Sequence, residues 1–115
     1  MGEIVYKIAR QAEWSEAERT GIFAGSPDDK RDGFVHLSSA AQVRATCAIH
    51  FAGERDLLLV AVDAERLGAE LKWELSRKGA RFPHLYGPLR LTDVESVTAI
   101  QTEPDGRAVF PSEIP

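Results

Sequence analysis

The stretch that most constrains the fold of this chain is "DLLLVAVD", residues 56–63, which is apolar at every position from 57 to 62. A strand with one face in solvent alternates apolar and polar residues, whereas a strand covered on both faces is apolar throughout. A membrane-spanning helix would need about 20 apolar residues, far more than this run supplies. We therefore expect a central strand with a packed layer on each side.

Alternation and helical spacing predict the remaining elements. Strands are expected at residues 3–9, 33–37, 69–75 and 94–103, with "RAVF" returning as a short strand after the turn signal "PDG". Helices are expected at residues 11–21 and 39–53, with one helical turn at residues 64–68. Residues 21–33 contain three glycines, a proline and three aspartates and are expected to form a loop, as is the basic, Gly- and Pro-rich stretch 76–90.

These elements predict one domain covering residues 1–115, since 115 residues is the size of a single domain. The expected fold class is α+β: a compact domain with a mixed, mainly antiparallel sheet of five or six strands and two main helices. The loop at residues 21–33 is long enough to cover a site.

Charge and cysteine content narrow the function classes. The net charge is −4, which argues against general nucleic-acid binding through phosphate contacts. Residues 72–90 nevertheless contain five basic residues against one acid, a local excess that fits a small anionic ligand or, alternatively, a solvated basic loop. One cysteine, no secretory signal and no membrane segment predict a cytoplasmic protein.

The first candidate site is "GFVHLSSAAQV", residues 33–43, where a strand is followed by a helix. Ser39 and Gln42 have the spacing of a capping box, which would start the helix there. A helix N-terminus attracts anions, so His36, Ser38 and Ser39 are candidates to bind a ribose or phosphate. The alternative is that His36 only fills space and donates a hydrogen bond to nearby backbone.

The second candidate site lies in "ELKWELSRKGARFPHLYGPL", residues 70–89. Proline keeps the segment around His84 and Tyr86 extended, so these two side chains share a face and can line a cleft. Arg77 and Arg81 could neutralise an anion there, and Glu74 is the nearest acid. The alternative is an edge segment whose apolar residues cover the core.

Other reactive residues are weaker candidates. Cys47 lies on the apolar side of the expected helix, where a thiol is normally inert. His50, near the helix end, is expected to bind carbonyl groups there. His36, Glu74 and His84 have no metal-motif spacing, so no metal site is predicted.

The blocks "DGFVHLSSAAQV", "DLLLVAVD", "LKWE" and "FPHLYGPL", in this order, closely resemble the bacterial family known as domain of unknown function 952. The resemblance covers nearly the whole chain and implies a fold like that of ADP-ribosyltransferases, with NAD as a candidate cofactor. It implies that His36 holds a ribose, followed by small polar residues at the serines. Tyr86 and Glu74 are the candidates for that fold's nicotinamide-side tyrosine and catalytic glutamate, although their order and context differ.

The combined expectation is a pocket for a nucleotide-like or phosphorylated small ligand. If the protein is an enzyme, NAD-linked or phosphate-ester transfer is expected, with His36 positioning the ligand and Glu74 stabilising positive charge that develops on the sugar. The alternatives are a domain that senses such a ligand without chemistry, and a protein-interaction domain.

Overall fold

The computed structural model describes residues 3–111 and 114, and its largest element is a five-stranded antiparallel sheet. The strand order is β10-β9-β5-β1-β4. The bounds are β1 Ile4–Arg10, β4 Ser38–Ser39, β5 Leu57–Asp63, β9 Val94–Thr102 and β10 Ala108–Val109. Strand β5 lies at the centre and is buried from Leu57 to Val62, which confirms the expected central strand. The hairpin of β9 and β10 was also predicted.

Two smaller sheets complete the strands. One has the order β3-β7-β6, and the other pairs β2 with β8. The bounds are β2 Ile22–Phe23, β3 Val35–His36, β6 Leu71–Leu75, β7 Arg81–Leu85 and β8 Leu89–Arg90. Every pairing among the described strands is antiparallel, so the expectation of a mixed sheet is wrong. Five of the described strands have five or more residues.

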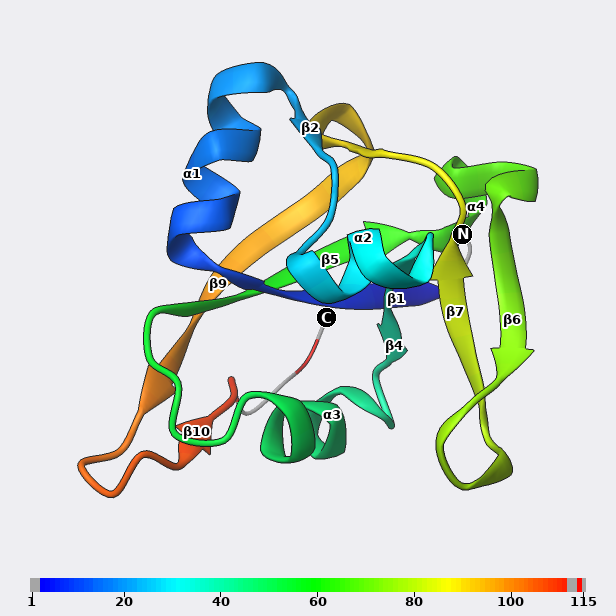
Figure 1. Cartoon of the computed structure of the whole chain (residues 1–115). Helices are drawn as coiled ribbons and strands as arrows, with labels where there is room; N and C mark the ends of the chain where they lie inside the picture. Colours follow the sequence, from blue (N-terminus) through cyan, green and yellow to red (C-terminus); the bar gives the residue numbers. More distant parts are fainter. Residues whose placement is uncertain (1–2, 112–113, 115) are drawn as a thin grey trace.

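Within the described residues, four α-helices and three 3-10 turns join the strands. The bounds are α1 Gln11–Thr20, α2 Pro27–Asp32, α3 Val43–His50, α4 Ala64–Leu67, η1 Gly68–Glu70, η2 Arg77–Gly79 and η3 Leu91–Asp93. Helices α1 and α3 lie on opposite sides of the sheet (Figure 1). No helix in the part of the chain that the structure describes is long and apolar enough to cross a membrane.

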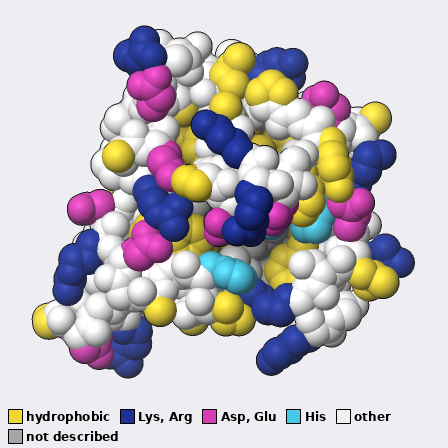
Figure 2. All heavy atoms as spheres, viewed as in Figure 1, with side chains coloured by type: hydrophobic (Ala, Val, Ile, Leu, Met, Phe, Trp, Pro, Cys, Tyr) yellow, Lys and Arg dark blue, Asp and Glu magenta, His cyan; other side chains and the backbone are white. Residues whose placement is uncertain are grey.

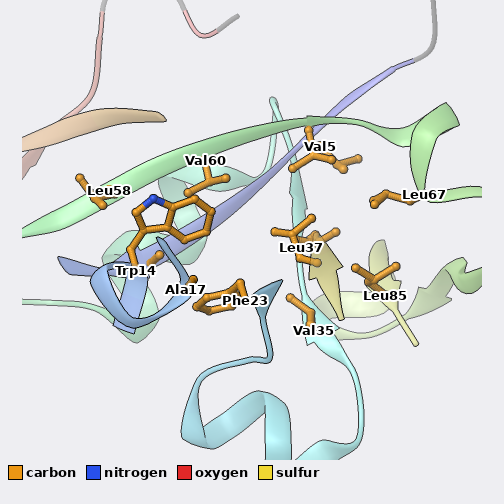
Figure 3. Close-up of a cluster of buried hydrophobic side chains, with 13 residues drawn as sticks. Val5, Trp14, Ala17, Phe23, Val35, Leu37, Leu58, Val60, Leu67 and Leu85 are labelled. Atoms are coloured by element: carbon orange, nitrogen blue, oxygen red, sulfur yellow. The ribbon is translucent and has the colours of Figure 1, made fainter. Parts of the chain in front are cut away.

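The two faces of the central sheet are covered by separate apolar clusters. Trp14 and Ala17 of α1 pack with Phe23, Leu37 and Leu85 against one face (Figure 3). Val43 and Cys47 of α3 pack against the other. Each large side chain buried in this way contributes about 1.5–3 kcal/mol, so the two clusters together hold the helices on the sheet.

The expected loop at residues 21–33 is wrong in its second half, because α2 forms there. Ser26 and Asp29 form a reciprocal capping box at its start, and Pro27 occupies the first helical position. Both features favour helix initiation. In the first half of this segment, Phe23 is buried and Ile22 is exposed.

The helix predicted at residues 39–53 begins later, at Val43, and ends at His50. Ser39 belongs to β4, and only one half of the expected capping box exists: the Ser39 N–H donates to the Gln42 side chain at 2.9 Å. The sheet pairing of β4 with β1 competes with the helix for these residues. Ile49, near the end of α3, is exposed.

The irregular segment predicted around residues 76–90 contains β7, which is the middle strand of its sheet. Pro83 has no N–H to donate, and it is tolerated because it lies opposite the end of β3, where it only has to accept a hydrogen bond. Its carbonyl accepts the Leu37 N–H at 3.0 Å, just beyond His36, where β3 stops. A proline inside a strand normally argues against such a position, which explains the error.

Candidate functional site

The candidate site is a cavity of about 440 Å³ between α2, the β3–β7 strands and the end of α3. All three histidines of the chain line it: His36, His50 and His84. Figure 2 shows histidines on this face with Lys, Arg, Asp and Glu side chains gathered around them. A concave site with convergent titratable groups is the usual place for ligand binding or catalysis.

A buried ion pair between Lys7 and Asp29 forms the floor of the cavity. Lys7 comes from β1 and Asp29 from α2; the Lys7 Nζ lies 2.8 Å from Asp29 Oδ2, and both side chains are almost fully buried. Lys7 also donates to the carbonyl of His36 at 3.2 Å. The pair therefore links the central sheet, α2 and β3 at one point.

The Asp29 carboxylate has three further hydrogen-bond contacts besides Lys7. The backbone N–H groups of Ser26 and His36 donate to it at 2.9 and 3.1 Å, and the His36 Nδ1 lies 2.6 Å away. Burial alone would raise the pKa of Asp29, but the hydrogen bond from His36 and the charge of Lys7 outweigh it and hold the pKa well below its usual range. Asp29 is therefore ionised at neutral pH.

The His36 ring lies between two carboxylates. Its Nδ1 faces Asp29 and its Nε2 lies 3.0 Å from Asp32 Oδ2. The Nδ1 contact is a hydrogen bond with the buried carboxylate, and the Nε2 contact is an ion-pair distance to the more exposed one. Both ring nitrogens of His36 are thus held by carboxylates.

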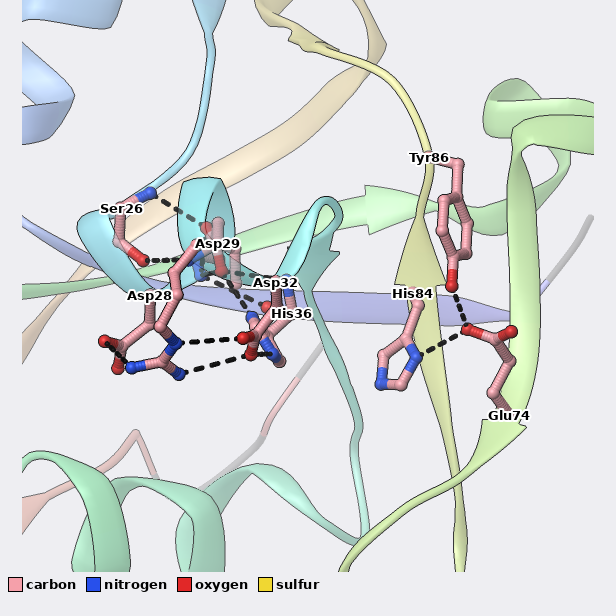
Figure 4. A network of polar contacts seen from close by, with 10 residues as sticks. Ser26, Asp28, Asp29, Asp32, His36, Glu74, His84 and Tyr86 are labelled. Carbon is pink, nitrogen blue, oxygen red and sulfur yellow. Dashed lines mark hydrogen bonds and ion pairs between the residues drawn. The ribbon is translucent and has the colours of Figure 1, made fainter.

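A second carboxylate holds the second imidazole. The Nδ1 of His84 lies 2.8 Å from Glu74 Oε1, and the hydroxyl of Tyr86 donates to the same oxygen at 2.7 Å. In Figure 4 the other nitrogen of His84 points away from Glu74. The hydrogen bonds from Tyr86 and His84 lower the pKa of Glu74, and the same contact raises the pKa of Tyr86.

Phe34 sets the spacing of the two imidazoles. Its ring stacks on His84 with centroids 4.0 Å apart and lies 4.5 Å from the His36 ring. The two imidazole centroids are 5.7 Å apart. Phe34 therefore contacts both rings and holds them close together in the cavity.

Four cationic side chains reach the cavity, and they differ in their partners. Lys7, Arg10 and Arg31 are each paired with carboxylates. Arg77 stacks on Phe82, and among the residues that the structure describes it has no carboxylate partner. Arg77 is thus the cation best placed to meet an incoming anion.

The structure brings together half of the residues singled out from the sequence. His36, Ser38, Arg77 and His84 line the cavity, whereas Ser39, Glu74, Arg81 and Tyr86 do not. The Ser38 hydroxyl donates to Thr46 Oγ1 at 3.3 Å. Glu74 holds the His84 ring from outside the cavity and is itself hydrogen-bonded to Tyr86. The Arg81 guanidinium lies 3.4 Å from the carbonyl of Trp73.

Sequence reasoning missed the ion pair and the third histidine. Lys7 interrupts an apolar strand on the face it shares with Val5, which signals a buried charge in need of a partner. The signal for Asp29 is the Ser-Pro-Asp-Asp start of α2. His50 lines the cavity mouth from the last turn of α3, a placement that only the packing of α3 reveals.

The described part of the chain contains no group of three or more His, Cys, Asp or Glu side chains arranged to hold a metal ion. What the cavity residues offer directly is acid–base chemistry and anion binding. Cys47 is buried and burial raises the pKa of its thiol, so it stays protonated.

Fold and site together define a small antiparallel α+β domain with two carboxylate-held histidines in one cavity. Residues 8–97 match the family described as protein of unknown function (DUF952), and the chain belongs to this family.

Solved structures of the protein CC0527 from Caulobacter crescentus are similar over nearly the whole chain. Its crystal structure is 48% identical, with a TM-score of 0.88, and the match covers 91% of this chain and 92% of that chain. Its solution structure is also 48% identical, with a TM-score of 0.80 and coverage of 90% and 89%. No curated protein matches the chain.

Proposed function

We propose that the cavity carries out acid–base transfer on a small phosphate ester, with His84 as the base and His36 as the acid. The observation that carries this proposal is the pair of carboxylate-held imidazoles in one cavity, 5.7 Å apart. Phosphoryl transfer needs a base for the nucleophile and an acid for the leaving oxygen, and each supplies about 10²–10⁴-fold in rate.

His84 suits the role of base because Glu74 fixes its tautomer. A carboxylate only accepts hydrogen bonds, so the contact at 2.8 Å places the ring proton on Nδ1. The lone pair is then on Nε2, which is directed away from Glu74 (Figure 4). A water or hydroxyl group can give its proton to this nitrogen as its oxygen attacks phosphorus.

His36 suits the role of acid because both of its ring nitrogens face carboxylates, which accept hydrogen bonds from ring N–H groups. Asp32 is at the surface, so a substrate oxygen can replace it at Nε2. As the bond from phosphorus to the leaving oxygen breaks, that oxygen takes the Nε2 proton. His36 ends neutral and His84 protonated, and proton exchange with solvent restores both.

Arg77 supplies the charge that a phosphate needs. Its guanidinium lines the cavity without a carboxylate partner in the described residues, and a planar guanidinium binds phosphate oxygens in pairs. Two aromatic side chains of the cavity lining, Phe51 and Phe82, could pack against a sugar or base.

The geometry favours phosphate-ester transfer over the NAD-linked transfer that the ADP-ribosyltransferase resemblance predicts. Glu74 does not line the cavity, and its carboxylate is engaged by Tyr86 and His84. It is therefore a positioning residue for His84 and is not free to stabilise a cationic sugar. We retain the cytoplasm as the expected compartment, which fits the free thiol of Cys47.

The test is a turnover assay with nitrophenyl phosphomonoesters and diesters, nucleoside cyclic phosphates and NAD, on wild type and three histidine variants. We expect His84→Ala and His36→Ala each to lower kcat by about 10²–10⁴-fold. His50→Ala is the matched control, because His50 lines the same cavity without a carboxylate among its described neighbours, and its effect should stay below about tenfold.

Thermal unfolding of the same samples separates the outcomes. Stabilisation by a phosphorylated compound without turnover would show that the protein is a sensing domain and not an enzyme. Turnover that survives His84→Ala would overturn the assigned base. The absence of both turnover and stabilisation across the panel would remove the phosphate-ester proposal and favour a protein-interaction domain.

A further inference from the structure

The outer edge of β6 carries an unusual concentration of exposed apolar side chains. Figure 1 places β6 at the edge of the molecule with β7 on its inner side, and no described strand pairs with its outer side. Trp73 is 36% exposed and Leu75 is 65% exposed. An edge strand with exposed apolar residues is a template for pairing with another strand.

The hydrogen-bond register shows which backbone groups face outward. The Tyr86 N–H donates to the Glu70 carbonyl at 2.8 Å, and the Ser76 N–H donates to the Ala80 carbonyl at 2.9 Å. In an antiparallel pair, residues with such bonds alternate with residues whose groups point the other way. The N–H and carbonyl groups of Leu71, Trp73 and Leu75 therefore point outward.

Most of these outward groups have no partner among the described residues. The Leu71 N–H donates to the Gly68 carbonyl at the end of η1, and the Arg81 guanidinium lies 3.4 Å from the Trp73 carbonyl. A bond of this length is weak, so an incoming strand can replace it.

The sequence of β6, "LKWEL", is complementary to itself in the antiparallel sense. If two copies pair about a two-fold axis at Trp73, Leu71 faces Leu75 of the other copy and Lys72 faces Glu74 of the other copy. Opposite charges and apolar pairs directly across two strands are stabilising, whereas like charges are destabilising. The charge pattern therefore favours a second copy of this chain over an unrelated strand.

We propose that β6 pairs with β6 of a second copy, so that two three-stranded sheets join in the order β3-β7-β6-β6-β7-β3. Such a two-fold contact is closed, since each copy uses its single outer edge and leaves none for a third. Trp73 and Leu75 lie on one face of the joined sheet and become covered by their counterparts.

The proposed pairing also brings the second copy close to the candidate site. Lys72 and Glu74 lie on the face of β6 that carries His84, and Glu74 is the residue that holds the His84 ring. In the pair, Lys72 of the second copy comes beside Glu74. This places a positive charge from each copy next to the carboxylate that positions the other copy's histidine.

Sedimentation of wild type and two charge variants over a wide concentration range tests the pairing. We expect wild type to reach twice the 12.7 kDa of one chain, and Lys72→Glu and Glu74→Lys each to remain monomeric because like charges then face each other. Mixing the two variants restores opposite charges at both contacts, so the mixture should associate. Circular dichroism of each variant confirms that it is folded.

Two exposed apolar positions provide a matched control. Leu75→Lys should abolish association, whereas Ile49→Lys, at a 53% exposed position on α3, should leave it unchanged. A monomeric wild type, equal effects of the two lysine substitutions, or a variant mixture that stays monomeric would each overturn the proposal.

Discussion

The two carboxylate–histidine pairs of the cavity are built in opposite ways. In the Asp29–His36 pair the carboxylate side chain is 2% exposed and the imidazole 38% exposed. In the Glu74–His84 pair the imidazole is 6% exposed and the carboxylate 39% exposed. Figure 4 shows the two pairs side by side.

This difference separates a carboxylate that holds the fold from one that holds a ring. Asp29 binds Lys7, caps α2 through Ser26 and binds the backbone of His36. Among the residues that the structure describes, the Glu74 carboxylate has hydrogen bonds only with the side chains of His84 and Tyr86. Loss of Asp29 should therefore mainly lower the stability of the fold. Loss of Glu74 should mainly impair the chemistry of His84.

The largest expected effect is that of Asp29→Ala on stability. Removing the carboxylate leaves the ammonium of Lys7 buried without a counter-charge, which costs about 3–5 kcal/mol. Urea unfolding followed by circular dichroism measures the loss. Because a domain of this kind has about 5–15 kcal/mol in total, much of its stability should disappear.

Asp32→Ala is the control for this prediction, because Asp32 also contacts His36 but lies at the surface. Its change should stay within about 0.5 kcal/mol. Equal losses in the two variants would show that Lys7 does not depend on Asp29, and the contrast between buried and exposed carboxylates would fail.

The next effect is on the pH dependence of unfolding. The pKa of Asp29 is lowered from 3.8 in the folded protein, so the unfolded chain takes up this proton first as the pH falls. Its contribution is complete above about pH 4 and decreases as the pH falls below that value. Urea unfolding between pH 3 and 6 should therefore show a steeper decline for wild type than for Asp29→Ala. Parallel curves would contradict the lowered pKa.

The central sheet was predictable because its evidence is local. Six consecutive apolar residues at 57–62 allow only a strand covered on both faces, and the turn signal "PDG" determines the hairpin that follows β9. The start of α3 was not predictable, because Ser39 could cap a helix or pair with β1. Only the assembled sheet decides between the two.

The candidate site was half predictable for the same reason. His36 was identified as a polar residue in an apolar strand, and His84 as part of an extended segment that proline keeps out of a helix. The carboxylates that hold these histidines were not assigned from the sequence. Lys7 contacts Asp29 only because α2 packs on β1. Glu74 contacts His84 only because β7 forms as a strand despite Pro83 and pairs with β6. Long-range register, which local pattern does not encode, brings these groups together.

Glu74→Gln is expected to change stability least, and it is the sharpest test of the Glu74–His84 pair. The amide can donate to Nδ1 of His84 as well as accept from it, so the tautomer with a lone pair on Nε2 is no longer enforced. We expect kcat on the best phosphate ester of the assay panel to fall about tenfold or more, while stability changes by less than about 0.5 kcal/mol.

Tyr86→Phe is the matched control, because it removes the other hydrogen bond to the same oxygen and leaves the His84 contact intact. A fall in kcat with Glu74→Gln but not with Tyr86→Phe assigns the effect to the imidazole, whereas equal falls, or a large loss of stability, would show that Glu74 holds the sheet.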